Sequence, residues 1–417
     1  MKKLLIVLFV LLSFKVSSQE NINIKIDKLE DNLDSIKKEK EKILLKLEYL
    51  KLLRIRQDIQ KIGLPKHTKD DVIIKHSAMS LCYDEKYEQA KWVVHIITAD
   101  IIYGNTPRSN DFRIDSLVKT GSAEEKDYFL KHLKPDSTYE YDGYGYDRGH
   151  LAPSADFRWS KKAVSESFFY SNMSPQRDKF NRERWADLEN TIRQYVIESK
   201  EQVFVVTGGV LTDGLYTIGK NKVGIPEYFY KIVLDYEGNE KKAIAFIMPN
   251  ESCVYPVMHY AVNVDSVEKL TGIDFFPDIP DEQENKIEAH YDIKKWQTKK
   301  NKNNVQPLDT KDLSKGQFNT VEAKSHIGEK ITVCGTVVST RYSKKGNTFI
   351  NLDQTFHNQI FTITIWKNNR VNFSYKPEKE LLNKKICVKG IVIKDYKGIP
   401  AMNIKNEKAI KFIDDKY

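Results

Sequence analysis

The chain has 417 residues, of which 40% are hydrophobic and 30% are charged, and its formal net charge is +9. This length predicts about two to three domains with globular cores. The charge is a modest bias toward polyanionic partners, but charge alone favours a solvated surface over nucleic-acid binding. Beyond the first 18 residues, no apolar run is long enough to span a bilayer.

Residues 1–18 predict a cleaved secretory signal peptide. Lys2 and Lys3 precede an apolar run of about 11 residues, and small residues follow at 16–18. The run is too short for a membrane helix, which needs about 20 residues. Removal of Lys2, Lys3 and Lys15 leaves a mature net charge of 9 − 3 = +6. We therefore expect a secreted or periplasmic protein.

Residues 19–65 predict a long, coiled-coil-like helix. Apolar residues recur at steps of three, four and seven, interrupted at Lys40, and Gly63 and Pro65 end the pattern. The positions that form this seam are Ile22, Ile26, Leu29, Leu33, Ile36, Ile43, Leu47 and Leu50. Two interpretations stay open: a homodimer through residues 20–62, or a single helix packed against the domain that follows.

Residues 66–296 predict a mixed α+β domain. The strand-like runs are rich in β-branched and aromatic residues, and helical patterns occupy 178–199 and about 265–271. The predicted strands are 92–97, 203–209, 228–236 and 243–249. Residues 297–317 are mostly polar and lack periodicity, which indicates a linker.

Residues 318–417 predict a small Greek-key barrel, because about five short strands alternate without a long helix. These strands are expected around 331–337, 349–351, 361–365, 386–388 and 391–393. The four cysteines of the chain, Cys82, Cys253, Cys334 and Cys387, lack the C-x-x-C spacing of a metal site. They allow three pairings in an oxidising compartment, or they remain buried thiols.

The most informative segment of the α+β domain is Asp147-Arg148-Gly149-His150, within YGYDRGHLAPSADF. A neutral histidine can take a proton from water near neutral pH. Gly149 permits a close approach of the backbone or an unusual dihedral angle. His150 is therefore a candidate general base.

A second group of polar residues follows in FNRERWADLE. The amide oxygen of Asn181 suits a magnesium ion that keeps most of its water shell. Glu189 lies eight residues later, about 12 Å along an ideal helix, which favours a role through water over shared ligation. A helix cap and a solvated glutamate are the plain alternatives for these two residues.

Three further residues complete the candidate site. Arg108 and Arg148 can hold an anionic transition state through bidentate guanidinium bonds. Asn172, before a turn that contains proline, can orient His150 or a phosphate oxygen, although a turn asparagine needs no function. A base, a metal ligand and guanidinium groups are the parts that cleavage of a phosphodiester requires.

These segments resemble the sugar-non-specific DNA/RNA endonuclease family, which has the ββα-metal fold. The resemblance spans residues ~75–296. Its motifs stand here as Asp147-Arg148-Gly149-His150; Asn172 with Pro175-Gln176; Asn181, Trp185 and Glu189; Arg108, Phe112 and Asp115; and the segment 271–281.

The resemblance implies a role for each residue. His150 is then the general base, and Asn181 is the sole protein ligand of a hydrated Mg²⁺, for which Mn²⁺ can substitute. Arg108 stabilises the phosphorane, and Glu189 positions water at the metal. Water attacks phosphorus in line, the 3′-oxygen leaves, and the products of DNA and RNA carry 5′-phosphates.

The C-terminal domain resembles an OB-fold more weakly, through HIGEKITVCGTVV and VKGIV. Basic residues would follow phosphates and aromatic residues would stack on bases. The alternative is that Trp366 belongs to the core and the other candidates to a solvated surface. The candidates are Arg341, Tyr342, Lys344, Lys345, Trp366 and Arg370.

Two functions therefore compete. The first is a secreted, Mg²⁺-dependent endonuclease that acts on DNA and RNA. The second is a catalytically inactive nucleic-acid-binding or assembly protein built on a nuclease fold. The complete set of His150, Asn181, Arg108 and Glu189 favours the enzyme, because a degenerate scaffold is expected to have lost at least one of them.

Overall fold

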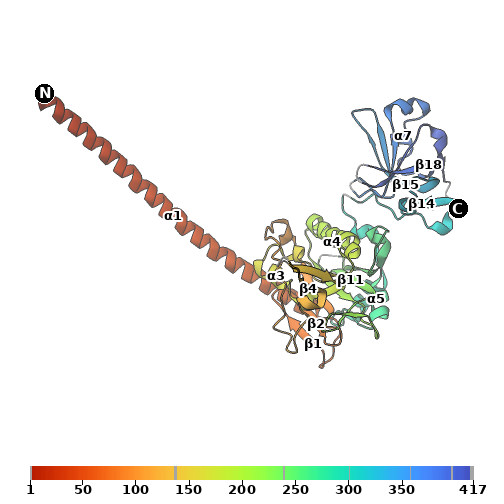
Figure 1. Ribbon diagram of the computed structural model, residues 1–417, viewed down its shortest axis with the longest axis horizontal. Helices are drawn as coiled ribbons and strands as arrows, with labels where there is room; N and C mark the ends of the chain where they lie inside the picture. Colours follow the sequence, from red (N-terminus) through yellow and green to blue (C-terminus); the bar gives the residue numbers. More distant parts are fainter. Residues whose placement is uncertain are drawn as a thin grey trace. The chain divides into compact units, whose positions relative to one another are not determined.

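The structure is a computed structural model. It contains two compact units, Met1–Asp58 and Ile59–Tyr417 (Figure 1). The residues described are 2–135, 139–237, 240–299, 301–356, 358–395 and 398–413.

The first unit is helical. Helix α1 (Lys2–Ile62) is continuous and includes the segment expected to be a signal peptide. All eight seam residues from Ile22 to Leu50 are between 46% and 68% exposed. Buried apolar side chains begin at Leu52. None of the described helices is long and apolar enough to cross a membrane.

Helix α1 ends where the sequence predicts, at Gly63. Its amide donates to Ile59 O at 2.9 Å, and its φ of +96° is a conformation that favours glycine. A Cβ at this position would also lie 2.2 Å from Asp278 Oδ2. Glycine is therefore required here both by the backbone and by the packing.

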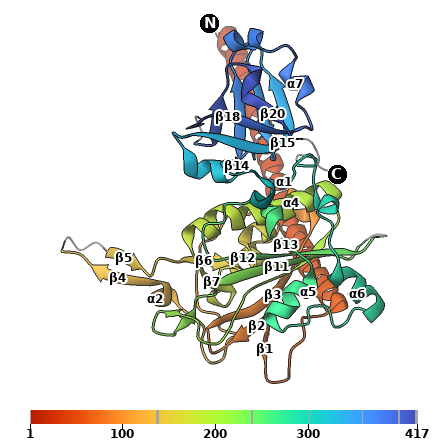
Figure 2. The ribbon, with the colours of Figure 1, turned by 90° about the vertical axis from the view of Figure 1, so that its right-hand side faces the viewer.

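A seven-stranded antiparallel sheet forms the centre of the second unit (Figure 2). The strands predicted from sequence lie in β3, β8, β11 and β12. In spatial order the sheet contains β1 (Val72–Lys75), β2 (Met79–Asp84), β3 (Gln89–Ile97), β8 (Val203–Gly209), β11 (Tyr228–Asp235), β12 (Lys242–Pro249) and β13 (Ala261–Val262).

Alternate residues of β11 face two different layers, as strand geometry requires. Phe229 stacks on Phe180, and its ring also lies near that of Trp185, at centroid distances of 5.3 and 5.9 Å. The next residue, Tyr230, contacts Phe275 at 5.4 Å. Helix α4 (Ala186–Ser199) therefore covers one face of the sheet. Helices α5 (Val264–Thr271) and α6 (Asp281–Ala289), on either side of Phe275 in the sequence, cover the other (Figure 2).

The helix predicted at 178–199 is not uniformly α-helical. Its first part is a π-helical segment, η4 (Phe180–Trp185), followed by α4. Phe180 and Trp185 are both fully buried and both contact Phe229. A separation of five residues places two side chains on one face only when the helix is widened to the i→i+5 pattern. The assumption of an ideal α-helix between Asn181 and Glu189 was therefore wrong.

Short elements surround the sheet. A satellite core that includes Tyr128, Tyr170 and Met173 lies beside the ribbon of β6 and β7. The elements are η1 (Ala99–Ile102), α2 (Glu125–Tyr128), β4 (Phe129–Leu133), β5 (Tyr139–Gly143), β6 (Asp147–His150), η2 (Ser154–Phe157), α3 (Lys161–Glu166), η3 (Tyr170–Asn172), β7 (Met173–Gln176), β9 (Thr217–Ile218), β10 (Val223–Gly224), η5 (Val257–Tyr260) and η6 (Ile293–Trp296).

The C-terminal strands close into a barrel. Strand β15 pairs with both β16 and β18, which completes the circle β15-β16-β17-β19-β18. The elements are η7 (Thr310–Asp312), β14 (Gln317–Asn319), η8 (Glu322–His326), β15 (Lys330–Tyr342), β16 (Thr348–Leu352), β17 (Phe361–Ile365), η9 (Lys367–Asn372), α7 (Pro377–Glu380), β18 (Lys385–Lys394), β19 (Pro400–Asn403), η10 (Glu407–Ala409) and β20 (Ile410–Phe412).

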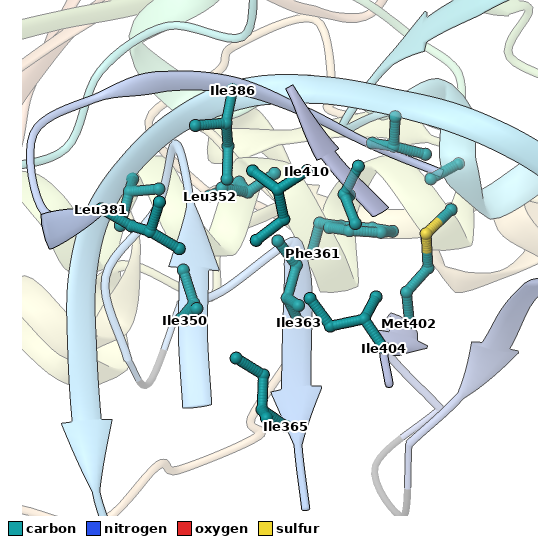
Figure 3. Packing of buried hydrophobic residues seen from close by; sticks show 14 of the residues in the cluster. Ile350, Leu352, Phe361, Ile363, Ile365, Leu381, Ile386, Met402, Ile404 and Ile410 are labelled. Carbon is teal, nitrogen blue, oxygen red and sulfur yellow. The ribbon is translucent and has the colours of Figure 1, made fainter. Parts of the chain in front are cut away.

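The barrel has its own apolar core, in which side chains such as Ile350, Phe361 and Ile363 point toward one another (Figure 3). The two strands predicted at 386–388 and 391–393 are one strand, β18, because Gly390 continues the pairing with β15 at Ile331. Cys334 and Cys387 are directly opposite on β15 and β18 and form a disulfide. Cys82 and Cys253 are buried free thiols.

Candidate active site

The ribbon of β6 and β7 positions the sequence motif. Asp147 pairs with Gln176 and His150 pairs with Met173 in this two-stranded antiparallel sheet. A Cβ on Gly149 would lie 2.1 Å from Gln176 Oε1, so the close approach expected of this glycine is confirmed. Any larger residue would displace the Gln176 side chain or separate the two strands.

Asn172 fixes the backbone that follows His150. Its Nδ2 donates to Ala152 O and Ser167 O at 2.9 and 2.8 Å, and its Oδ1 accepts from Ala152 N at 2.9 Å. The side chain is fully buried. With both amide hydrogens bonded within the protein, Asn172 is placed to hold the His150 loop and has no donor left for a phosphate oxygen.

His150 lies in an aromatic pocket and is only 8% exposed. The centre of its ring lies 4.8 Å from that of Phe168, with the two rings edge to face, and 5.9 Å from that of Phe112. Among the described residues, none forms a hydrogen bond with its buried Nε2. Burial, followed by the charges of Arg108 and Arg148, lowers the pKa of His150 to about 3. The imidazole is therefore neutral at neutral pH and has a nitrogen free to accept a proton.

Two guanidinium groups flank this imidazole. The guanidinium of Arg108 lies 4.9 Å from the Phe168 ring, and that of Arg148 lies 3.7 Å from the Phe112 ring. Arg148 Nη1 also contacts Tyr170 Oη at 3.4 Å and Glu125 Oε1 at 3.7 Å. Burial, and then the charge of Arg148, lowers the pKa of Arg108, because a nearby positive charge disfavours protonation. Such an arrangement attracts an anion.

Asp147 orients Asn181. The Asn181 Nδ2 donates to Asp147 Oδ2 at 2.9 Å, and Arg182 binds the same carboxylate through Nε at 2.8 Å and Nη2 at 2.5 Å. Because Asp147 holds the Nδ2 atom of Asn181, the Oδ1 atom of Asn181 is the one available to a cation. Asp147 was missed as a site residue, although it is the first residue of the motif.

Glu189 lies in a buried charged network, with only 14% of its side chain exposed. Burial raises its pKa to about 7, although Lys231, Arg193 and Arg108 act to lower it. Arg193 Nη2 lies 3.9 Å from Glu189 Oε2, and its Nη1 bonds Asp156 Oδ1 at 2.7 Å. Asp156 in turn bonds His95 Nε2 at 2.9 Å.

Lys231 is the most deeply buried cation of this network, with 1% exposure. Its Nζ donates to Thr207 Oγ1 at 2.6 Å and to Leu151 O at 3.4 Å, and it lies 5.0 Å from the centre of the Trp185 ring. Burial lowers its pKa to about 8. Sequence reasoning missed Lys231, although a charge within the apolar run YFYKIVLD was a usable signal.

A cleft of about 740 Å³ adjoins the Asp147 end of the ribbon. Tyr146 directly precedes Asp147, and Arg177 directly follows Gln176, which is the strand partner of Asp147. The backbone oxygen of Arg177 accepts a hydrogen bond from Asn181 N at 2.9 Å. The lining also includes Tyr216, Tyr228, Asn250 and Glu251. The lining therefore combines tyrosine rings with one guanidinium, that of Arg177, and two carboxylates, those of Glu227 and Glu251.

The barrel candidates gather around the β15–β16 hairpin and the end of β17. Arg341, Tyr342, Lys344 and Lys345 are exposed. Trp366 is 45% exposed, so it does not belong to the core.

Arg370 does not fit the expectation of a free phosphate contact. It forms two 2.7 Å bonds with Glu378, and its guanidinium lies 4.5 Å from the Tyr342 ring. Glu378 therefore already neutralises this guanidinium.

Comparison with known proteins assigns the family. The sequence pattern described as DNA/RNA non-specific endonuclease matches residues 55–282. The chain is 31% identical to mitochondrial endonuclease G of Bos taurus over 236 residues, 53% of this chain and 74% of that protein. It is 30% identical to nuclease C1 of Cunninghamella echinulata var. echinulata over 240 residues, 53% of this chain and 88% of that protein.

One solved structure, the EndoG/EndoGI complex, is 29% identical, covers 54% of this chain and 93% of that chain, and has a TM-score of 0.47. The family match extends over more than half of the chain and includes every candidate residue of the site. The resemblance noted from the motifs is confirmed: the chain belongs to the DNA/RNA non-specific endonuclease family and is a nuclease that hydrolyses phosphodiester bonds.

Proposed function

We propose that this nuclease is a Mg²⁺-dependent endonuclease of DNA and RNA in which His150 is the general base. One observation carries the proposal: among the described residues none is a hydrogen-bond partner of the buried His150 Nε2, and the charges of Arg108 and Arg148 act on this imidazole. This pairing of a proton acceptor with anion-binding groups suits attack of water on a phosphodiester.

The residues present fit a hydrated divalent cation. Asn181 would hold Mg²⁺, or Mn²⁺ in its place, through Oδ1, because Asp147 fixes its nitrogen. Mg²⁺ keeps several waters and is satisfied by few protein ligands, which suits a single amide oxygen. When bound, the ion would neutralise charge on the phosphate as a Lewis acid.

The protein groups divide the remaining work. His150 Nε2 takes a proton from the water that attacks phosphorus, while Arg108 and Arg148 stabilise the charge that grows on the phosphoryl oxygens. Glu189, flanked by Arg193, accepts hydrogen bonds from water near Asn181. The P–O3′ bond breaks, the departing 3′-oxygen takes a proton from solvent to become a hydroxyl, and a 5′-phosphate remains on the other product.

The cleft beside Asn181 suits the nucleotides next to the scissile phosphate. Arg177 lies 5.6 Å from the ring of Tyr146, and Tyr216 is 84% exposed. Guanidinium groups bind phosphates and tyrosine rings stack on bases without selecting sequence. Contacts of this kind are consistent with cleavage that ignores base identity.

The flanking parts extend the proposal. The N-terminal signal-like segment and the Cys334–Cys387 disulfide both support export to an oxidising compartment. The barrel is proposed to bind nucleic acid in the manner of an OB-fold, through the exposed group at its hairpin. The exposed seam of α1 supports a homodimer through residues 20–62.

Digestion by the purified protein tests the function. Supercoiled plasmid and structured RNA are incubated with and without EDTA, and then with Mg²⁺ restored. Metal-dependent nicking and linearisation of plasmid, together with RNA cleavage to products that carry 5′-phosphates, is the expected result. Cleavage that persists in EDTA, or attack on free ends alone, would overturn the proposal.

A further inference from the structure

Three carboxylates meet where helices α5 and α6 come together. Asp265 and Glu268 lie one turn apart on α5, and Glu288 lies in the last turn of α6. Each offers one oxygen, and these oxygens all lie within 4.8 Å of one another. The amide of Asn263, the N-cap of α5, donates to Ala289 O at 3.0 Å and so brings the two helices together at this point. We call these three residues the α5–α6 acid cluster.

Glu288 is what separates this cluster from an ordinary acidic surface. The residue is only 7% exposed, no hydrogen-bond partner is found among the described residues for its buried Oε1, and its carboxyl forms a side-chain hydrogen bond with that of Glu268. A buried carboxylate without a donor is costly unless a cation compensates it. Two carboxyl groups this close require either a bound cation or a shared proton between them, and no described side chain supplies the cation.

The surroundings add negative charge. Asp274 and Glu284 lie close enough to act electrostatically on Glu288. The lysine found here is Lys66, whose Nζ is 3.5 Å from Asp274 Oδ2 but whose side chain is 73% exposed. An exposed lysine of this kind compensates neighbouring carboxylates only weakly.

We propose that the α5–α6 acid cluster binds one divalent cation, of the Ca²⁺ type, that fastens α5 to α6. Ca²⁺ takes six to eight oxygen ligands at about 2.3–2.6 Å, so two of its ligand oxygens can lie up to about 5 Å apart, and the cluster meets this limit. Asp265 is exposed, so water can complete the shell on the solvent side. Ca²⁺ accepts such irregular oxygen sets, whereas Mg²⁺ demands a near-ideal octahedron.

The alternative occupant is a proton. The carboxyls of Glu268 and Glu288 are hydrogen-bond partners, so in the absence of a cation they would share a proton. The two occupants predict opposite effects of replacing Glu288 by glutamine. A glutamine would lose cation binding, but it would imitate a protonated acid without loss of stability.

The test measures Ca²⁺ binding and thermal unfolding of the full chain that carries N181A, so that the proposed catalytic ligand contributes nothing. Ca²⁺ at about 100 times its Kd is expected to raise the Tm by about 5–10 °C. Glu288→Gln should abolish this rise, and Asp265→Asn should weaken Ca²⁺ binding about tenfold or more without unfolding the protein. Glu282→Gln, at an exposed acid of α6 that pairs with Lys286, is the matched control.

The outcomes separate clearly. Equal stabilisation of all variants by Ca²⁺ would overturn the site. An absence of any Ca²⁺ effect would overturn it as well, and an E288Q protein as stable as its parent would then identify a protonated pair. Mg²⁺-dependent cleavage by E288Q with Asn181 intact should stay at the parental level below the Tm, so this test does not depend on the catalytic proposal.

Discussion

Lys231 controls the ionisation of Glu189 in our account, and replacement of Lys231 by methionine tests this. Among the charges that lower the pKa of Glu189, that of Lys231 has the largest effect. Burial alone would raise the pKa of Glu189 above its value of about 7. Methionine has a similar length and can fill the space beside Trp185 without a charge. We expect the pKa of Glu189 to rise in the K231M variant, so that less of it is ionised at neutral pH.

The size of the effect follows from the titration. With a pKa of about 7, about half of Glu189 is ionised at pH 7. If K231M shifts the protonation equilibrium of Glu189 by about tenfold, roughly a tenth of Glu189 remains ionised at pH 7. The kcat at pH 7 should therefore fall about fivefold and recover as the pH rises. Because the pKa of His150 is about 3, the acid limb of the wild-type profile near neutral pH should follow Glu189 and not His150.

The assay is initial cleavage of a fluorogenic oligonucleotide from pH 5 to 9 at saturating Mg²⁺. Lys242→Met is the matched control, because Lys242 also projects from the central sheet but pairs with Asp235 at 3.1 Å. Its profile should match wild type. A K231M profile that superimposes on wild type, or one lowered by the same factor at every pH, would refute the assigned coupling.

Three further predictions follow from the same geometry. N181A should bind Mg²⁺ far more weakly than E189Q in metal titrations of cleavage, since Asn181 is the proposed ligand and Glu189 acts through water; the reverse order would exchange their roles. Deletion of 318–417 should leave cleavage of short oligonucleotides intact but raise the KM for long substrates at low salt through lost multivalency, and an unchanged KM would argue against binding by the barrel. Sedimentation of the mature protein should give a dimer and that of 64–417 a monomer; a full-length monomer, or a dimer that survives truncation, would exclude pairing through α1.

The strands and the chemical motif could be predicted from sequence because both depend on local patterns. Alternating β-branched runs located β3, β8, β11 and β12, and the motif spacing identified the family. The continuous β18 was not predicted, because Gly390 interrupts its apolar pattern while its pairing with β15 is a long-range interaction.

The support around the candidate site was less predictable, because it depends on contacts distant in sequence. Asp147 reaches Asn181 across 34 residues, and Lys231 reaches Leu151 across 80. The π-helical turn likewise depends on where Phe229 of another strand lies, which no local pattern of FNRERW reveals. Sequence thus identified the groups proposed to meet substrate, and the structure added those that hold them.

The central claim is that His150 is the general base, and single-turnover cleavage by His150→Ala tests it most directly. At saturating Mg²⁺ and enzyme excess, the account predicts a loss of roughly 10²–10⁴-fold in the rate of the chemical step. DNA affinity and the thermal unfolding curve should stay close to wild type. An H150A protein that folds, binds DNA and cleaves at the wild-type single-turnover rate would contradict the account.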